Sequence, residues 1–274
     1  MKRLLAFGVG IIGLAVANAH AAAMFVDLGT ADPFAVLAGS TVTNTGLTTI
    51  NGSLGVAPGT AITGLPEVVA GGTLQASSAV ASQAQSDLAT AYDFAAGEAS
   101  NFNLTGTDLG GLTLTPGVYT FASSAQLTGK LTLDGQGDPN AVFLFQIGST
   151  LTAAGSSSVV SVNGGTGDSV FFQIGSSATL GADTAFEGNI LALTDITLNT
   201  GSTIGCGRAL ARNGAVTLDT NTVSIDTASC ETTAINDAGR TTGGTGSTAV
   251  PEPASLAGLA VGLLGLGLAR RPKR

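Results

Sequence analysis

The sequence is poor in the residues that carry most enzyme chemistry. Its 274 residues include no tryptophan, one histidine and two cysteines, and charged residues make up 10 % of the chain, against about 25 % in an ordinary soluble domain. The one histidine, His20, lies in a segment that we expect to be removed. A mature domain without histidine lacks the commonest general base and the usual activator of a serine or cysteine nucleophile. We therefore expect no catalytic residues, no enzymatic activity, no cofactor and no small-molecule substrate.

Two pairs of carboxylates leave a minor alternative open. They are Asp134 with Asp138, and Asp183 with Glu187. Each pair stands beside glycine or other turn-forming residues, where aspartate usually caps a turn. A glycosidase or lyase that uses one of these pairs is the less favoured interpretation.

Basic residues are scarce outside the two ends of the chain. Between residues 24 and 249 the only cations are Lys130, Arg208, Arg212 and Arg240, and they face seventeen acidic residues. Nucleic-acid binding needs clustered cations, so we expect no nucleic-acid partner. The acidic balance suits a secreted protein that must stay soluble.

Residues 1–23 are typical of a secretory signal peptide. Lys2 and Arg3 precede the apolar run Leu4–Val16, and small residues follow. This order predicts cleavage between Ala19 and Met24. An uncleaved membrane anchor is the alternative.

Glycine and threonine are abundant, at 40 and 36 residues. Short segments such as Ile196–Leu198 and Val216–Leu218 alternate apolar and polar residues and end at turn-formers, which indicates very short strands. The segment Phe145–Ser149 recurs as Phe172–Ser176, and Leu131–Asp134 is echoed by Val216–Asp219. Degenerate repeats of this kind predict an irregular β-solenoid.

One stretch, residues 73–96, contains no glycine or proline and has helical spacing. Its apolar positions are Val80, Ala84, Leu88, Ala91, Tyr92 and Ala95. A helix of this length would extend about 36 Å and could cover one flank of the solenoid. A partner-binding helix is the competing interpretation, but the small apolar face suits close packing on the chain's own sheet.

Several long segments resemble the microbial ice-binding (antifreeze) family with a discontinuous β-solenoid. They are GNILALTDITLNTGSTIGCGRALARNGAVTLDTNTVS at 188–224, the block Asp27–Gly64, LTPGVYTF at 114–121 and LTLDGQGDPNAVFLFQIGSTL at 131–151. The resemblance implies a mostly β, discontinuous solenoid at 24–233 with the helix lying alongside. It also implies adsorption to ice, with ice shaping or inhibition of recrystallisation. A structural or adhesive protein of the cell surface or extracellular matrix, using the same solenoid without ice activity, is the alternative.

Threonine suits a surface that orders water, because its χ1 is stiff on a strand and it presents a hydroxyl beside a methyl group. Some members of the resembled family carry T-A/G-x-T/N steps on their ice-binding face. This implies an ice-binding role for Thr45, Thr48, Thr60, Thr63, Thr200 and Thr203. Outward positions on predicted strands and turns add Thr194, Thr197, Thr217 and Thr220, together with Thr150, Thr152, Ser177 and Thr179.

The C-terminal part carries a linker and a second resemblance. Residues 234–249 are rich in glycine, threonine and serine, which is typical of a flexible linker. Pro251-Glu252-Pro253, the apolar run 254–269 and a basic end then resemble a PEP-type C-terminal sorting signal of Gram-negative bacteria. That resemblance implies export to the cell surface or medium, transient anchoring in the membrane, and a sortase-like processing enzyme as partner. A plain C-terminal anchor shares this topology.

Cys206 and Cys230 are the two cysteines. In an exported chain an even pair predicts one disulfide, and closing this loop would contribute roughly 3 kcal/mol. A two-thiolate metal site is the less favoured alternative, because no histidine remains to complete it. We expect no metal.

Overall fold

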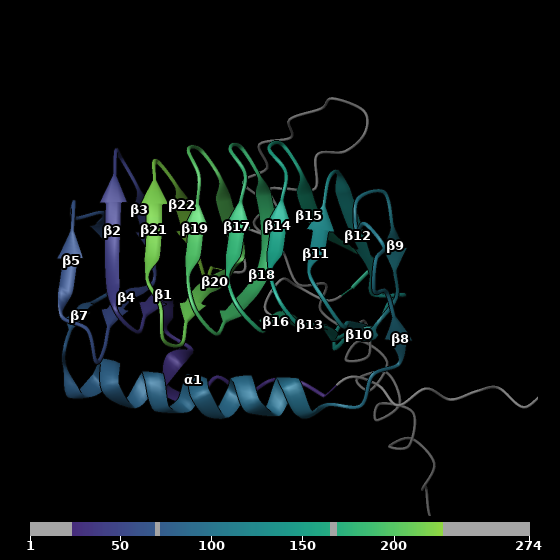
Figure 1. Cartoon of the computed structure of the whole chain (residues 1–274), viewed down its shortest axis with the longest axis horizontal. Coiled ribbons are helices and arrows are strands. Elements are labelled where there is room, and N and C mark those ends of the chain that lie inside the picture. The colour runs from purple at the N-terminus through teal and green to yellow at the C-terminus, as the bar shows by residue number, and fades with distance from the viewer. Residues whose placement is uncertain (1–23, 69–71, 165–168, 227–274) are drawn as a thin grey trace, which may run out of the picture. The chain divides into compact units, whose positions relative to one another are not determined.

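The computed structural model describes residues 24–68, 72–164 and 169–226, all of which belong to the first of two units of the chain, Met1–Ala234. Their strands form two parallel sheets (Figure 1). The first sheet has seven short strands. In spatial order they are β11 (Ala125–Leu127), β14 (Leu151–Ala153), β17 (Ala178–Leu180), β19 (Ile196–Leu198), β21 (Val216–Asp219), β2 (Thr41–Thr45) and β5 (Ala61–Thr63).

The second sheet has fifteen strands and bends around a corner of the solenoid. Two long strands make the bend, because β18 (Ala185–Ala192) and β20 (Thr203–Ala211) each contribute to both sides. On one side, which we call the second face, lie β9 (Thr113–Leu114), β12 (Lys130–Asp134), β15 (Ser158–Val162), β22 (Thr222–Ser224), β3 (Thr49–Asn51) and β6 (Glu67–Val68).

The other side of the second sheet, which we call the helix face, faces the one α-helix of the described residues. Its strands are β8 (Phe102–Asn103), β10 (Gly117–Phe121), β13 (Phe143–Ile147), β16 (Val170–Ile174), β1 (Phe34–Ala38), β4 (Ser53–Val56) and β7 (Leu74–Ala76). Each coil therefore runs along the seven-stranded sheet, the second face and the helix face in turn. The predicted β-solenoid is confirmed.

The solenoid is discontinuous in sequence. Strands β1, β2 and β3, from the start of the chain, pair in parallel with β20, β21 and β22, from its end. Figure 1 shows this as purple strands lying beside green ones. The first coils thus stack on the last. The register between them is set by contacts between residues from opposite ends of the described sequence.

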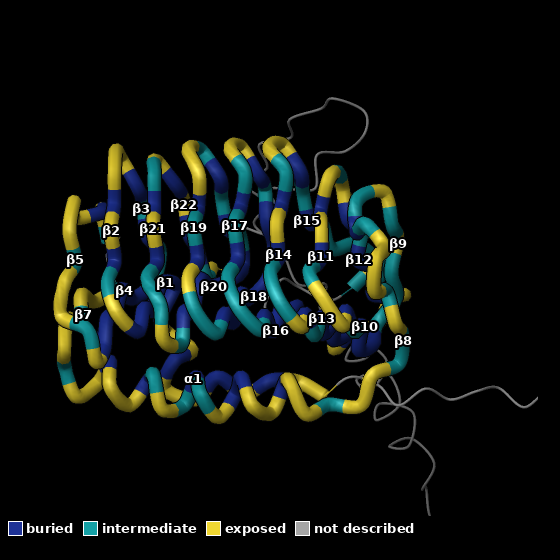
Figure 2. Tube along the Cα trace, in the orientation of Figure 1, coloured by how far each residue is buried: buried dark blue, intermediate teal, exposed yellow. Residues whose placement is uncertain are grey.

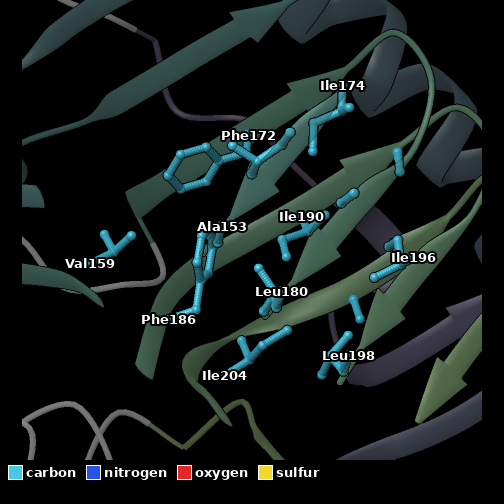
Figure 3. Close-up of a cluster of buried hydrophobic side chains, with 14 of the residues drawn as sticks. Ala153, Val159, Phe172, Ile174, Leu180, Phe186, Ile190, Ile196, Leu198 and Ile204 are labelled. Carbon is cyan, nitrogen blue, oxygen red and sulfur yellow. The ribbon is translucent and has the colours of Figure 1, made fainter. Parts of the chain in front are cut away.

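Apolar side chains fill the interior of the coils (Figure 3). Phe145 and Phe172 occupy equivalent places on β13 and β16, with ring centroids 4.5 Å apart. Tyr119 and Phe186 extend this stack on either side. The predicted repeat at 145–149 and 172–176 is therefore one coil stacked on the next. Such stacked rings add about 0.5–1.5 kcal/mol per pair beyond their burial.

The second sequence echo does not mark equivalent positions. Leu131–Asp134 lies in β12 on the second face, whereas Val216–Asp219 forms β21 in the seven-stranded sheet. The two segments share an alternating pattern because both have one buried side. Alternation reports burial and carries no information on which side of a coil a strand occupies.

The helix α1 (Ala79–Gly97) is shorter than the predicted 73–96 at its start and extends one residue further at its end. Ser78 caps it by accepting a hydrogen bond from the backbone N–H of Ala81 at 3.0 Å, and the preceding residues form β7 instead. Val80 was predicted to face the sheet but is 53 % exposed, and Ala81 is buried in its place. The other predicted contact positions are buried: Ala84, Leu88, Ala91, Tyr92 and Ala95.

Polar bonds fix the helix on its sheet. The hydroxyl of Tyr92 donates to the carbonyl oxygen of Ile174 at 3.1 Å, and Gln146 Nε2 donates to the carbonyl oxygens of Ala95 and Glu98 at 2.9 and 2.7 Å. Gln146 thereby satisfies carbonyls at the end of the helix that have no partner within it. The helix belongs to the fold, which favours the packing interpretation over a partner-binding helix.

Asp87 ties the N-terminal segment to the outer side of α1. Its carboxylate accepts hydrogen bonds from the hydroxyl and backbone N–H of Thr30, at 2.6 and 2.8 Å, and from Gln83 at 2.9 Å. The hydrogen bonds from Thr30 hold the pKa of Asp87 below its ordinary value of 3.8. A carboxyl group with a lowered folded pKa stabilises the fold above its unfolded pKa, and this contribution is lost as the pH falls through the folded value.

We expect Asp87→Ala to lower the unfolding temperature at pH 7. The change removes the two hydrogen bonds from Thr30 that hold the N-terminal segment and one from Gln83 within the helix. The difference from wild type should narrow as the pH falls below 3.8. Thermal melts followed by circular dichroism at neutral and acidic pH measure both effects. Ser82→Ala, at another exposed position of the same helix, is the control. Equal melting temperatures of Asp87→Ala and wild type at pH 7 would contradict the prediction.

Cys206, on β20, is disulfide-bonded. Cys230, the predicted partner, lies outside the described residues, as do the signal peptide, the linker and the C-terminal sorting signal. Within the described part of the chain, no helix has the length and apolar character needed to cross a membrane.

Candidate functional site

The outward side of the seven-stranded sheet carries a single row of threonines. In most of its strands one outward residue stands between two buried residues, as Thr152 does between Leu151 and Ala153. The strand register places these outward residues directly beside one another. In order they are Gln126, Thr152, Thr179, Thr197, Thr217, Thr43 and Thr63. We call this surface the threonine face.

The row has a regular spacing because the strands that carry it are hydrogen-bonded neighbours. Adjacent strands lie about 4.7–4.9 Å apart, so six threonines follow one another at this interval. Figure 1 shows the seven strands side by side with nearly the same direction. Branching at Cβ restricts χ1 of each threonine, so hydroxyl and methyl groups can recur in a regular arrangement.

Charged groups at the margins of the threonine face are engaged in hydrogen bonds. Asp195 accepts a hydrogen bond from the backbone N–H of Ala215 at 2.8 Å. Asp219 accepts hydrogen bonds from the hydroxyls of Thr200 and Thr220. The central row itself holds no charged residue. The row therefore presents hydroxyl and methyl groups, and the carboxylates of Asp195 and Asp219 at its margins are hydrogen-bonded to protein groups.

The structure brings some predicted site residues together and separates others. Thr63, Thr197 and Thr217 lie in the central row. Thr45 is exposed at the end of β2, and Thr60 is exposed just before β5. Thr194, Thr200 and Thr220 lie at corners beside the sheet, with Thr194 hydrogen-bonded to Ser177 at 2.7 Å and the other two bonded to Asp219.

Two predicted residues do not belong to this surface. Thr48 is 1 % exposed, and its hydroxyl accepts a hydrogen bond from the backbone N–H of Asn221 at 3.0 Å. It cannot contact an external surface in this structure. Thr203 begins β20 and pairs with Thr222 on the second face. The two residues therefore leave the candidate site.

The T-G-x-T steps mark corners of the solenoid. Gly46 and Gly201, the second residues of two steps, have left-handed φ angles of 73° and 74°. An added Cβ at Gly46 would lie 2.2 Å from Thr220 Oγ1, and one at Gly201 would lie 2.4 Å from Asp183 Oδ1. Glycine is needed there because the chain turns sharply against the neighbouring coil. The first and last threonines of such a step consequently point to different sides of the solenoid.

Sequence reasoning missed Thr43 as a site residue and ranked Thr152 and Thr179 below the corner residues. All three lie in the central row. A signal for them was present, since each stands between two residues whose side chains point inward. The threonine at the centre of a very short strand was thus a better indicator than the T-x-x-T spacing.

A buried polar row lines the inner side of the corners between the seven-stranded sheet and the second face. Its members, which we call the corner row, are Ser157, Thr184, Ser202, Asn221 and Thr48, each at most 2 % exposed. Asn221 Nδ2 donates to the carbonyl oxygens of Asn199 and Ser202 at 2.9 and 3.0 Å. Its Oδ1 accepts the backbone N–H of Asp219 at 2.6 Å. These bonds satisfy backbone groups that leave the strand ladders at the corner.

Three of the four carboxylates considered for catalysis accept hydrogen bonds within turns and strands of the fold. Asp134 accepts hydrogen bonds from Gln136 N and Asn163 Nδ2 at 2.9 and 3.1 Å, and Asp138 accepts one from Asn140 N at 2.8 Å. Glu187 is buried and accepts the backbone N–H of Ser161 at 2.7 Å. Within the described residues, no group of three or more histidine, cysteine, aspartate or glutamate side chains is placed to hold a metal ion.

Comparison with known proteins gives two family matches. Residues 36–224 match the model described as ice-binding-like, and residues 249–274 match the PEP-CTERM protein-sorting motif. The first match spans both sheets and the helix. The second confirms the resemblance of the C-terminal segment to a sorting signal, which indicates export to the cell surface or extracellular space.

Individual relatives agree with these matches. An ice-binding protein of Nostoc sp. (strain HG1) is 59 % identical over 247 residues, which cover 90 % of this chain and 87 % of the relative. Among solved structures, an ice-binding protein from an Antarctic biological consortium is 45 % identical with a TM-score of 0.72, covering 75 % of this chain and 93 % of that one. An ice-binding protein of the Antarctic ascomycete Antarctomyces psychrotrophicus is 41 % identical with a TM-score of 0.71, covering 74 % and 99 %.

Proposed function

The chain belongs to the ice-binding-like family, and from that premise we propose that it adsorbs to ice through the threonine face. The observation that supports this most directly is the uninterrupted row of six threonines on neighbouring strands. Ice presents an uncharged, regular lattice of water oxygens. A rigid surface with hydroxyl and methyl groups at fixed intervals can hold water in a matching arrangement.

The chemistry of the face favours ordered water over mobile water. Methyl groups of the row leave neighbouring water molecules without protein partners, so that these molecules bond to one another. Hydroxyl groups anchor that layer at intervals of about 4.8 Å. Charged side chains would orient water around themselves. The carboxylates of Asp195 and Asp219, and that of Asp108 beside Gln126, are bonded to protein groups. Adsorption would then inhibit recrystallisation and shape growing crystals.

The terminal segments place this activity outside the cell. We propose that residues 1–23 direct export and are cleaved between Ala19 and Met24. A sortase-like membrane enzyme would process the chain near Pro251-Glu252-Pro253, after transient anchoring through residues 254–269. Cys230 would pair with Cys206 on β20. This disulfide would tie the segment that leads to the linker to the solenoid.

The test is a measurement of ice recrystallisation and crystal shape with the exported protein. We expect slowed grain growth and faceted crystals, and a control protein without affinity for ice, such as albumin, should produce neither. A folded protein without any effect on ice would contradict the proposal. The chain would then be a structural or adhesive protein of the cell surface or matrix.

Gln126→Thr is expected to raise the activity, because Gln126 is the one residue of the central row that is not threonine and it occupies the outermost strand, β11. The substitution extends the row from six threonines to seven on an exposed position, where such changes alter stability by less than about 0.5 kcal/mol. The lowest concentration that blocks recrystallisation should fall. Val160→Thr, at a partly exposed position of β15 on the second face, is the control. If Gln126→Thr needs the same or a higher concentration to block recrystallisation, the prediction is wrong and the binding surface ends before β11.

A further inference from the structure

One end of the solenoid is open. Among the described residues, strands β5, β6 and β7 form the last coil, and each pairs with a neighbour on one side only: β2, β3 and β4 respectively. In Figure 1, β5 and β7 lie at the left end of the described solenoid, and Figure 2 shows that much of this coil is exposed. Three strand edges around one end thus present backbone groups that have no partner in either sheet.

The opposite end is partly covered by the chain itself, although β8 and β9 there also pair with one neighbour each. Residues 104–112 pass across this end, and Leu109 is completely buried. The backbone N–H of Leu109 donates to the carbonyl oxygen of Gln126 at 2.9 Å, and that of Gly111 donates to the carbonyl oxygen of Lys130 at 2.7 Å. This segment therefore covers the edge of β11 and the start of β12. Among the described residues, no comparable segment crosses the edges of β5, β6 and β7.

The open end is apolar and nearly uncharged. Leu65 is 72 % exposed and Leu74 is 47 % exposed, and the inward residues Ile62 and Val68 are half-buried. Glu67 is the one charged residue among the described residues from 57 to 78. Solenoids need polar terminal coils for solubility, and natural sheet edges carry lysine or are covered, because a bare edge pairs with another chain.

We propose that the open end is the docking surface for a second copy of this chain, in an end-to-end dimer. The two-fold axis runs through the junction perpendicular to the threonine face. This operation places β5 antiparallel to β5 of the second copy, and β6 against β7 of the second copy. A two-fold contact of this kind is closed and self-complementary, so it stops at two copies.

A second copy fits this end better than an unrelated partner would. Three edges surround one cross-section, and only another solenoid end of the same cross-section meets all three at once. Glu67 of each copy lies on β6 and meets the uncharged strand β7 of the other, so like charges are not opposed. A pocket of about 230 Å³ lined by Leu47, Leu65 and Pro66 borders the junction and can receive an apolar side chain.

The dimer enlarges the ice-binding surface, a consequence that rests on the proposed function. A two-fold axis perpendicular to the threonine face brings the two faces into one plane, with β5 of both copies at the centre. Thr63 then lies next to outward residues of the second copy, and the two rows form one longer surface. Binding through two linked rows raises the effective affinity without any new type of contact.

Sedimentation equilibrium of the exported protein, measured over a wide concentration range, tests the dimer independently of ice. We expect the mass of two chains. Replacing Leu65 and Leu74 together by lysine should weaken the dimer at least about tenfold, because four added charges would meet at the junction. Phe94→Lys is the matched control, since Phe94 is 37 % exposed on α1 and lies away from the open end. Circular dichroism checks that all variants are folded.

Two results would overturn the inference: a wild-type chain that sediments as a monomer throughout, or a dimer that survives both lysine substitutions. Ice assays separate this proposal from the proposed function. A folded dimer without ice activity would leave the dimer standing and remove the ice surface. A lysine variant that is monomeric and has lower recrystallisation inhibition per chain would support the coplanar arrangement.

Discussion

Thr197→Tyr is expected to remove at least about nine-tenths of the recrystallisation inhibition while leaving the fold intact. Thr197 occupies the fourth of seven positions in the central row, between Thr179 and Thr217. A tyrosine ring would stand above the plane of its neighbours, which lie about 4.8 Å away on either side. It would hold the remaining threonines away from a flat lattice. The loss of activity should therefore be larger than the one-sixth expected if each of the six threonines contributed equally and independently.

The fold should tolerate this change because residue 197 points outward. Ile196 and Leu198, on either side, carry the buried contacts of β19. Tyrosine is also favourable on a strand, and exposed substitutions usually alter stability by less than about 0.5 kcal/mol. Thermal melts should therefore be unchanged within a few degrees, and an activity loss in a folded protein can be assigned to the surface.

Thr203→Tyr is the matched control. Thr203 is also partly exposed and also stands in a row of hydroxyl residues, with Thr222 and Thr49, but on the second face. We expect it to keep wild-type activity. A loss in Thr203→Tyr with full activity in Thr197→Tyr would move ice binding to the second face. Equal activity in both variants and wild type would exclude both rows as the binding surface.

The sequence predicted the type of fold well, because that depends on local patterns. Short alternating strands, glycine at turns and the 27-residue repeat all indicated a solenoid, and Phe145 does stack on Phe172. The helix was also predicted from its spacing. Its start was misplaced because residues 74–76 pair with β4 and complete the last coil. Ser78, a good N-cap residue, was the local signal for the observed start.

The candidate site was predicted only in part, for a physical reason. A coil has three sides, and alternation shows which residues point outward but not to which side. The T-G-x-T steps lie at corners, where Gly46 and Gly201 turn the chain, so they could not define a flat face. The place of Thr43 in the row depends on the pairing of β2 with β21, which joins residues about 170 positions apart. Such a register is not encoded in any local pattern.

Asn221→Leu is expected to be the most destabilising of the substitutions considered, by about 3–5 kcal/mol. Leucine has a similar volume but no polar atoms. It would leave the carbonyl oxygen of Ser202 and the backbone N–H of Asp219 without the partner that Asn221 supplies. It would also remove one of the three donors to the carbonyl oxygen of Asn199. These groups are held inside a corner where Asn221 is 2 % exposed, and each buried unsatisfied group costs about 1–3 kcal/mol.

The loss should appear as a fall of roughly 6–20 °C in the unfolding temperature, given a shift of about 2–4 °C per kcal/mol in a domain of this size. Asn213→Leu is the control, because Asn213 is exposed and the same exchange there removes no buried hydrogen bond. An unfolding temperature of Asn221→Leu close to that of the control would contradict the prediction.

The same variant separates stability from ice binding. Asn221 does not lie on the threonine face, but it stabilises the corner at which the chain leaves the seven-stranded sheet after β21. Assays near 0 °C, where the weakened fold should still form, are expected to show wild-type ice activity per folded molecule. If activity falls in a protein that is fully folded by circular dichroism, the corner row also keeps the threonines in register. The flatness of the face would then depend on a buried polar row that makes no contact with ice.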